Sequence, residues 1–326
     1  MADPNIGQVA ATAWEFVHGD GPTDNIFTSQ ALLYLLREGG HQEYADGGRL
    51  FEMTVEYKIN PTFKSVSEME TLDTTRVDVF DAARYEQKIV AGTVVFSNLE
   101  DLRNAVANRK IDVVKGKLKN ATNSALEYLD GVLFLDGTGN AGKDPDGLQK
   151  TIPDNPLVGT VGTINAGLWS FWRSRQQAGN MGLAPFDNLA PALESVHNQC
   201  TLGGTDRKPT GIVTDRTSFE GYISTLTKIE RLVKDNAGSA DPDLGWLNDA
   251  VQFKGIPMVY DEQAPAARAY FINKNYLKLI VMQGGWMKML KPVDPANQLA
   301  TVHRVMSVLN LCASARRHQG VVTNIS

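Results

Sequence analysis

The sequence is poor in cysteine and has no long hydrophobic run. Cys200 and Cys312 are the only cysteines among 326 residues, and they lie too far apart to form a metal knuckle or a disulfide framework. We expect both to be buried apolar thiols. No apolar stretch approaches the ~20 residues that a membrane-spanning helix needs. A disulfide-rich scaffold and a helical membrane protein are therefore excluded.

The chain also lacks an excess of basic residues. Its 32 lysines and arginines are outnumbered by 37 aspartates and glutamates, which gives a net charge of −5. Such a surface as a whole repels phosphate backbones, so a dedicated nucleic-acid reader is disfavoured. The first residues lack the basic and apolar regions of a secretion signal, and we expect the chain to stay in the cytoplasm where it is made.

Motifs for catalysis and metal binding are missing as well. The five histidines never fall three or four residues apart, so no helix presents a metal-binding pair. No G-x-S-x-G nucleophile elbow occurs. We therefore predict no catalytic residue, no metal site and no cofactor.

One stretch partly fits a phosphate-binding loop. Residues Gly137 to Lys143 match G-x-x-x-x-G-K, but Asp144 stands where the magnesium-binding serine or threonine belongs. Pro145 and Gly147 also prevent the helix whose amides would hold phosphates. A structural loop is favoured, and a nucleotide-dependent enzyme that uses this stretch is the alternative.

What is present is a globular composition over a chain long enough for two compact units. Hydrophobic residues make up 42% of the sequence, enough apolar surface to offset the entropy of ordering. Residues 1 to about 45 predict two short helices. From Phe51 to Ile59, apolar and polar residues alternate strictly, and broken alternation continues to Phe96. This pattern predicts a long antiparallel hairpin or extension.

A long helix follows the hairpin. Ser97 to Glu100 form a capping box, and apolar residues then recur at helical spacing until Gly137. A helix of ~37 residues would be about 55 Å long, the length of a spine rather than of an ordinary domain helix. Its middle carries Arg109, Lys110, Lys115, Lys117 and Lys119 against Asp112, which indicates either a solvated face or a surface that meets a polyanion.

The second half of the chain mixes helix and strand patterns, so the fold class is α+β. Helices are predicted at 187–200 and 218–233. Strands are predicted at 211–214, 251–260, 270–272, 277–282, 286–290 and 299–313.

The order of these elements resembles the major capsid protein of tailed double-stranded-DNA bacteriophages, the Hong Kong-type phage capsid fold that encapsulins share. Five phrases carry the resemblance over about residues 25 to 315. They are Leu133 to Gly139 followed by Pro145 to Leu148, Gly211 to Asp215, Leu232 to Gly238, Phe253 to Val259, and Ala264 to Asn273. The turn at Asn273-Lys274 departs from the Gly-Asp that many relatives carry.

The resemblance implies five parts. They are an N-terminal arm (1–46), an extended β-loop (47–96), a peripheral domain with the spine helix (97–185), a mixed α/β axial domain (186–292), and a return to the peripheral domain with a C-terminal tail (293–326). It also implies a structural protein rather than an enzyme. Such a subunit self-assembles as hexamers and pentamers into the icosahedral shell of a tailed phage, and an encapsulin-like nanocompartment is the alternative.

The implied partners are copies of the chain itself. Packaged double-stranded DNA held non-specifically, a scaffolding protein, a portal and a decoration protein are the others, and no membrane is expected. The chain would be made in the cytoplasm of a bacterial host and end in the virion. Because only about 45 residues precede the loop, we expect an uncleaved arm along a neighbour, with a separate scaffold or intrinsic self-assembly.

Particular residues are expected to carry these contacts. The apolar face of the extended loop must be buried somewhere, and we expect it on a neighbouring subunit, with a hairpin folded onto its own domain as the alternative. The expected inter-subunit contacts are Trp14, Phe16, Leu32, Phe51, Met53, Val55 and Tyr57. The expected DNA-facing residues are Arg109, Lys110, Lys115 and Lys119.

Overall fold

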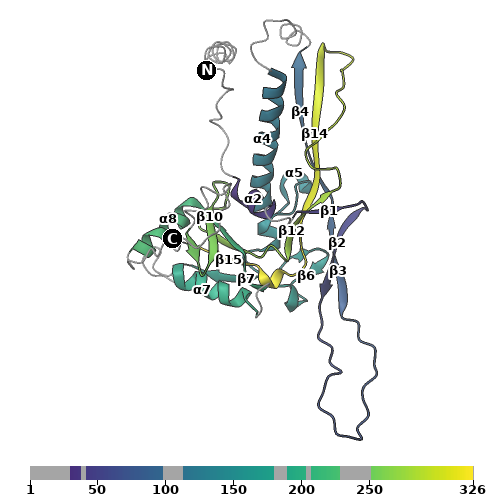
Figure 1. The fold of residues 1–326 in the computed structure, drawn as a ribbon, viewed down its shortest axis with the longest axis vertical. Coiled ribbons are helices and arrows are strands. Elements are labelled where there is room, and N and C mark those ends of the chain that lie inside the picture. The colour runs from purple at the N-terminus through teal and green to yellow at the C-terminus, as the bar shows by residue number, and fades with distance from the viewer. Residues whose placement is uncertain are drawn as a thin grey trace, which may run out of the picture.

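The computed structural model describes residues 30–37, 42–97, 113–179, 189–202, 207–227 and 251–325. Within these ranges the main helices are α2 (Ala31–Arg37), α4 (Val113–Phe134), α7 (Leu189–Cys200) and α8 (Arg216–Thr227). Shorter ones are α5 (Gly139–Gly142), α6 (Leu148–Thr151), η2 (Ser170–Trp172) and η5 (Arg316–His318). Figure 1 shows α4 standing beside two long strands, above a rounder mixed domain.

A five-stranded sheet forms the elongated part of the molecule. Its path runs β1 (Glu43–Ala45), β12 (Leu277–Met282), β14 (Ala300–Ala313), β13 (Lys288–Met289), and β4 (Lys88–Ser97) also pairs with β14. The β4–β14 ladder is antiparallel, from Ala300 opposite Ser97 to Leu309 opposite Lys88. Helix α4 runs along β4 (Figure 1), so helix and ladder brace each other.

A six-stranded sheet forms the rounder domain. Its order is β7 (Arg175–Ala178), β15 (Gly320–Thr323), β11 (Ala269–Ile272), β8 (Gly211–Thr214), β10 (Ile256–Tyr260) and β9 (Gln252–Phe253). Every residue of β8, β11 and β15 is buried, as expected for central strands covered on both faces. Helix α7 packs on β7 and β15.

Two small hairpins complete the fold. One is β2 (Leu50–Glu56) with β3 (Phe80–Glu86), and the other is β5 (Thr160–Val161) with β6 (Ile164–Asn165). Both contribute to one apolar cluster in which Phe51 and Tyr85 meet Trp172 of η2. The largest cluster, with Leu32, Leu133, Tyr270 and Leu279 among its members, joins α2 and α4 to both sheets. A single connected interior therefore holds the arm helix, the long helix and the two sheets together.

Most element predictions are confirmed. The strands at 211–214 and 277–282 match the predicted bounds, and the predicted final strand is β14. The predicted spine helix ends at Phe134; Ser97, its predicted first residue, is the last residue of β4, and residues 98–112 lie outside the described residues. Hereafter α4 is called the spine helix.

The strand pairings differ from the predicted boundaries at three places. β4, predicted to belong to the extended loop, pairs with β14 instead. β12, predicted in the axial domain, also pairs with β14, whereas β7 and β15, predicted in the peripheral parts, lie in the six-stranded sheet. Alternation in sequence identifies a strand but not its partner, so these pairings across the predicted boundaries could not be inferred from it, and the division into five parts stays a prediction.

Candidate functional site

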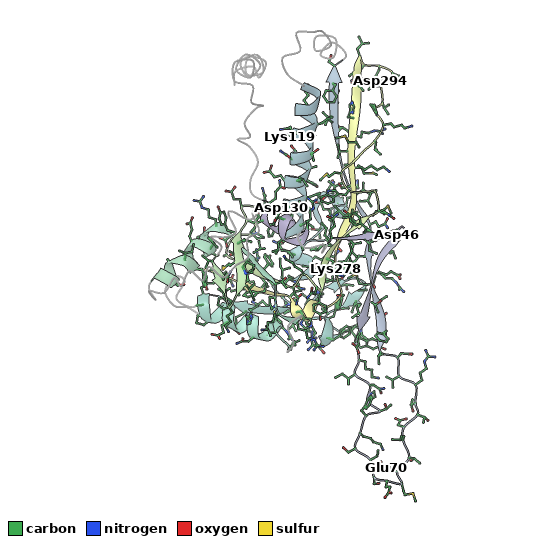
Figure 2. The ribbon with its side chains drawn as sticks, viewed as in Figure 1. Asp46, Glu70, Lys119, Asp130, Lys278 and Asp294 are labelled. Carbon is green, nitrogen blue, oxygen red and sulfur yellow. The ribbon has the colours of Figure 1, made fainter. Side chains whose placement is uncertain are left out.

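The most prominent surface feature is the long connection between β2 and β3. Residues 57–79 project from the rest of the molecule, with Glu70 near the tip (Figure 2). A backbone hydrogen bond of 3.0 Å from the Tyr57 amide to the Val79 carbonyl closes the base. Beyond it the segment forms no strand, and its order comes from local contacts such as the 2.6 Å ion pair of Lys64 with Glu70. We call residues 57–79 the projecting loop.

The projecting loop exposes large apolar side chains. Ile59, Phe63, Met69 and Leu72 expose 90%, 86%, 96% and 68% of their surface. Single exposed apolar residues are common, but four on one thin projection cannot cover each other and mark an interaction site. The loop therefore requires a partner surface.

Two carboxylates of the projecting loop have partners within it. The ion pair with Lys64 lowers the pKa of Glu70, and hydrogen bonds from Thr75 lower the pKa of Asp73. These two carboxylates already have partners within the loop, whereas its large apolar side chains remain exposed.

Side chains of β2, at the base of the projecting loop, pack against their own chain, which differs from the prediction. Phe51 and Val55 are 2% and 4% exposed, and they pack in the chain's own core with Ile164 and Trp172. Met53 is partly buried against the same cluster. The expectation that Phe51 and Val55 contact a neighbouring subunit is therefore wrong, and these two residues fit the alternative of a hairpin folded onto its own domain. A neighbour contact of the partly buried Met53 stays a prediction.

Tyr57 marks where this core ends. Its ring lies 6.0 Å from Trp169 edge-on and 6.1 Å from Phe171, measured between centroids. These aromatic contacts within the chain fix the angle at which the projecting loop leaves the body. Tyr57 is half-buried, so whether it also meets a neighbour stays a prediction.

A second surface feature is a groove between the spine helix and β4. It encloses a volume of about 910 Å³, with walls that include Val95 of β4, Ala121 and Ala125 of the spine helix, and Val305 of β14. Ile89 and Val95 expose 61% and 51% of their surface beside it. The groove is therefore a largely apolar surface between the spine helix and β4, two elements that Figure 1 shows on the other side of the body from the β2–β3 hairpin.

The predicted DNA-facing residues lie on or before the spine helix. Lys115 and Lys119 belong to α4, whereas Arg109 and Lys110 lie outside the described residues. Lys119 is exposed and does not line the groove (Figure 2). Its neighbour Lys117 instead lines the groove, with its Nζ 5.6 Å from the centroid of the Phe96 ring.

Of the predicted arm contacts, only Leu32 lies in the described residues. It is fully buried in the core of its own chain, so its expected role as an anchor on a neighbour is wrong. The first turn of α2 is held by two buried carboxylates, Asp130 of the spine helix and Asp261 after β10. Trp14 and Phe16 lie outside the described residues.

The stretch from Gly137 to Lys143 forms a tight structural turn. Asn140 and Ala141 have left-handed backbone angles, so no extended helix starts here. The buried carboxylate of Asp144 accepts a hydrogen bond of 3.0 Å from the Tyr128 hydroxyl and lies against Gly139. A buried negative charge inside the turn opposes phosphate binding, which supports the structural role over the nucleotide alternative.

Within the described residues, no group of three or more histidine, cysteine or acidic side chains could hold a metal ion. No helix in the same ranges is long and apolar enough to cross a membrane.

The exposed apolar residues of the projecting loop were missed by the sequence analysis. The alternation that reveals a strand stops near Pro61, and beyond it the apolar residues have no regular spacing. The sequence signal for their exposure is the irregular spacing of the apolar residues, because apolar residues without a helical or strand period cannot share one buried face.

Comparison with solved structures gives extensive matches. The chain is similar to the capsid asymmetric unit of cyanophage A-1(L), with a TM-score of 0.70 and 16% identity over 94% of this chain and 95% of that chain. It is also similar to an encapsulin complex from Synechococcus elongatus PCC 7942, with a TM-score of 0.60 and 10% identity over 94% and 90% of the two chains. The capsid of Myoviridae phage XM1 gives a TM-score of 0.57 and 11% identity over 93% and 94%. No protein-family model and no curated protein matches the sequence.

Proposed function

The chain has the Hong Kong-type phage capsid fold, and from this premise we propose that it is the major capsid subunit of a tailed phage, which self-assembles into an icosahedral shell around double-stranded DNA. The observation that carries the proposal is the projecting loop, whose apolar side chains have no partner within the described part of the chain. The likeness to capsids over nearly the whole chain supports it.

A contact between two copies of the chain would use two different surfaces. The projecting loop and the groove beside the spine helix lie on opposite sides of the body (Figure 1). Both are apolar, so a loop from one copy that packs against the groove region of the next buries both. A head-to-tail contact of this kind builds closed rings when its rotation closes. Hexamers and pentamers are such rings.

The contents of the shell separate the phage subunit from an encapsulin-like compartment. Both classes share the fold, and an encapsulin complex is among the similar structures. Lys119 is exposed on the spine helix, where a basic side chain can meet DNA phosphates, and this supports a nucleic-acid content. We therefore propose DNA as the cargo, with scaffolding, portal and decoration proteins as further partners of the shell.

The decisive experiment is negative-stain microscopy of the expressed chain, with analysis of the particle contents. We expect closed particles that contain nucleic acid and no enclosed enzyme. Particles that hold a protein cargo would favour the encapsulin-like alternative. Saturable binding of labelled ATP would favour the nucleotide-dependent enzyme.

A double variant tests the loop itself. Phe63→Asp with Met69→Asp should leave a folded subunit that no longer assembles, because it removes the exposed apolar contact. The control is Ser65→Asp with Thr71→Asp, which adds the same charge at exposed polar positions of the same loop. Normal particles from the Phe63/Met69 variant would contradict a loop-mediated contact.

A further inference from the structure

Four basic side chains gather at one end of the six-stranded sheet. β7 and β15 run parallel and start side by side, with Arg175 opposite Gly320. β8 starts at the same end, because Gly211 lies opposite the last residue of the antiparallel β11. Arg207 precedes β8, and Arg317 and His318 in η5 directly precede β15. We call Arg175, Arg207, Arg317 and His318 the basic cluster.

The members of the basic cluster influence one another. Burial and then the charges of Arg175 and Arg207 lower the pKa of Arg317. Burial is also the main cause of the lowered pKa of His318, to which the three arginines add. No carboxylate contributes to either shift. The cluster is thus a concentration of positive charge in a chain with a net charge of −5.

Within the described residues, no carboxylate forms an ion pair with Arg175, Arg207 or Arg317. The Nε of Arg175 is buried and has no hydrogen-bond partner there. Other basic residues nearby are paired in the usual way, as in the 2.7 Å contact of Lys254 with Glu194. Like charges held together without a counter-charge repel each other, so the fold maintains an arrangement that an anion would stabilise.

The surrounding contacts make the cluster rigid. The amide of Arg175 donates a 2.9 Å hydrogen bond to the carbonyl of Gln319. The Nδ1 of His318 lies 3.2 Å from the Cys200 carbonyl, and its ring stacks on Tyr276 at 4.6 Å between centroids. Because a carbonyl oxygen only accepts, Nδ1 of His318 carries the hydrogen, so the donors that the cluster offers to an anion are the three guanidinium groups. A fixed set of donors loses little entropy when it binds an anion.

We propose that the basic cluster is a binding site for phosphate oxyanions, and that in the assembled shell it holds backbone phosphates of the packaged double-stranded DNA. This inference rests on the proposed function. Three of the four side chains are arginines, whose planar guanidinium groups match phosphate oxygens in bidentate geometry. Because phosphate contacts carry no base information, the site would hold DNA of any sequence.

Phosphate is favoured over the carboxylates of a second copy. Several exposed carboxylates of this chain are already paired within it: Glu52 with Arg84, Glu86 with Lys88, Glu194 with Lys254 and Glu220 with Arg216. The remaining surface is acidic overall and repels DNA, so contacts would be confined to a few basic places. A weak, localised grip is compatible with packaging and release.

The test compares two charge-matched double variants of the full chain. Arg207→Gln with Arg317→Gln removes two exposed members of the cluster. Arg216→Gln with Lys254→Gln removes two exposed cations that have carboxylate partners. The probe is a labelled 30-base-pair DNA duplex, in two unrelated sequences, titrated with unassembled subunits from 50 to 200 mM salt.

We expect the slope of log affinity against log salt to fall in magnitude by about 2 in the Arg207/Arg317 variant, roughly one per phosphate contact removed. The control variant should keep the wild-type slope, and both duplexes should bind equally. Equal slopes for the two variants would overturn the proposal. Loss of particles from the Arg207/Arg317 variant with unchanged DNA binding would also overturn it and assign the cluster to a contact between copies. Particle formation by the wild type tests the proposed function separately.

Discussion

Asp130 of the spine helix and Asp261 after β10 hold the same short helix from two different parts of the fold. Oδ1 of Asp130 accepts a 2.9 Å hydrogen bond from the amide of Leu33, and Oδ2 of Asp261 accepts one of 3.1 Å from the amide of Leu32. Both carboxyl groups are fully buried. Burial, and then the negative charge of Asp261, raises the pKa of Asp130 to about 8. The junction of α2, the spine helix and the end of β10 therefore holds a proton at neutral pH.

This proton predicts a pH-dependent stability. The folded-state pKa of Asp130 is raised above that of an unfolded aspartate, so the folded state binds more protons between about pH 4 and pH 8. The contribution of Asp130 to stability is therefore fully present below about pH 4 and is lost as pH rises through about 8. The limiting slope is about 1.4 kcal/mol per pH unit. Urea unfolding of the subunit at several pH values measures it.

Asp130→Asn separates the charge from the hydrogen bond. An amide oxygen can still accept from Leu33, and an amide hydrogen replaces the carboxyl proton, so this variant should lose the pH-dependent part and be more stable than the wild type near pH 8. Asp130→Ala should be less stable than Asp130→Asn at every pH, because it leaves the Leu33 amide without its acceptor. An unchanged pH profile in Asp130→Asn would assign the dependence to other groups.

Replacement by alanine should lower the stability of the subunit at Phe51 but slow assembly at Phe63. Phe51 is 2% exposed and Phe63 is 86% exposed. Phe51→Ala should lower the free energy of unfolding by about 3–5 kcal/mol, because it leaves a cavity beside Trp172. Phe63→Ala should change it by less than about 0.5 kcal/mol while slowing assembly. Equal destabilisation by the two variants, measured by urea unfolding of subunits, would contradict the division between core and projecting loop.

The spine helix should contribute a smaller share of DNA retention. Replacing Lys110, Lys115 and Lys119 with glutamine should leave particles that hold less DNA. Each lysine removed leaves one phosphate fewer neutralised, so fewer counterions are released when DNA binds. The matched control replaces the same three lysines with arginine, which keeps the charge. The ratio of absorbance at 260 to 280 nm of purified particles measures the DNA content. An unchanged ratio at low and high salt would mean that this face of the spine helix contacts solvent and not DNA.

Local patterns predicted the elements of this fold well. Strict alternation identified β14, and a short apolar run between turn residues identified β8. Pairing was not predictable, because β4 and β14 are about two hundred residues apart and nothing local specifies that they form one ladder. The burial of Phe51 depends on Trp172, a residue far along the chain.

The candidate surfaces were less predictable than the elements. The alternating sequence pattern predicted the projecting region but favoured the residues at its base as contacts, because those alternate and Phe63 and Met69 do not. The basic cluster forms only when three strand starts meet, so Arg207 and Arg317 show no relation in sequence. Exposure and clustering are properties of the assembled fold, and a single sequence reports them poorly.

Replacement of two glycines by alanine should change the stability of the subunit in opposite directions. A Cβ at Gly147 would lie 2.3 Å from the Leu135 carbonyl oxygen and 2.6 Å from that of Leu133, both main-chain atoms at the end of the spine helix. Because backbone cannot move aside cheaply, Gly147→Ala should destabilise the subunit by about 1–3 kcal/mol or more.

Gly116 lies within the spine helix, and a Cβ there would meet no atom within 4 Å. Gly116→Ala should therefore stabilise the subunit by up to about 1 kcal/mol, because alanine loses less backbone entropy than glycine in a helix. Thermal unfolding of both variants beside the wild type gives the two signs directly. A neutral Gly147→Ala would mean that the turn after the spine helix can shift to admit a methyl group, and the close approach at Gly147 would then not fix how the helix end joins the following turn.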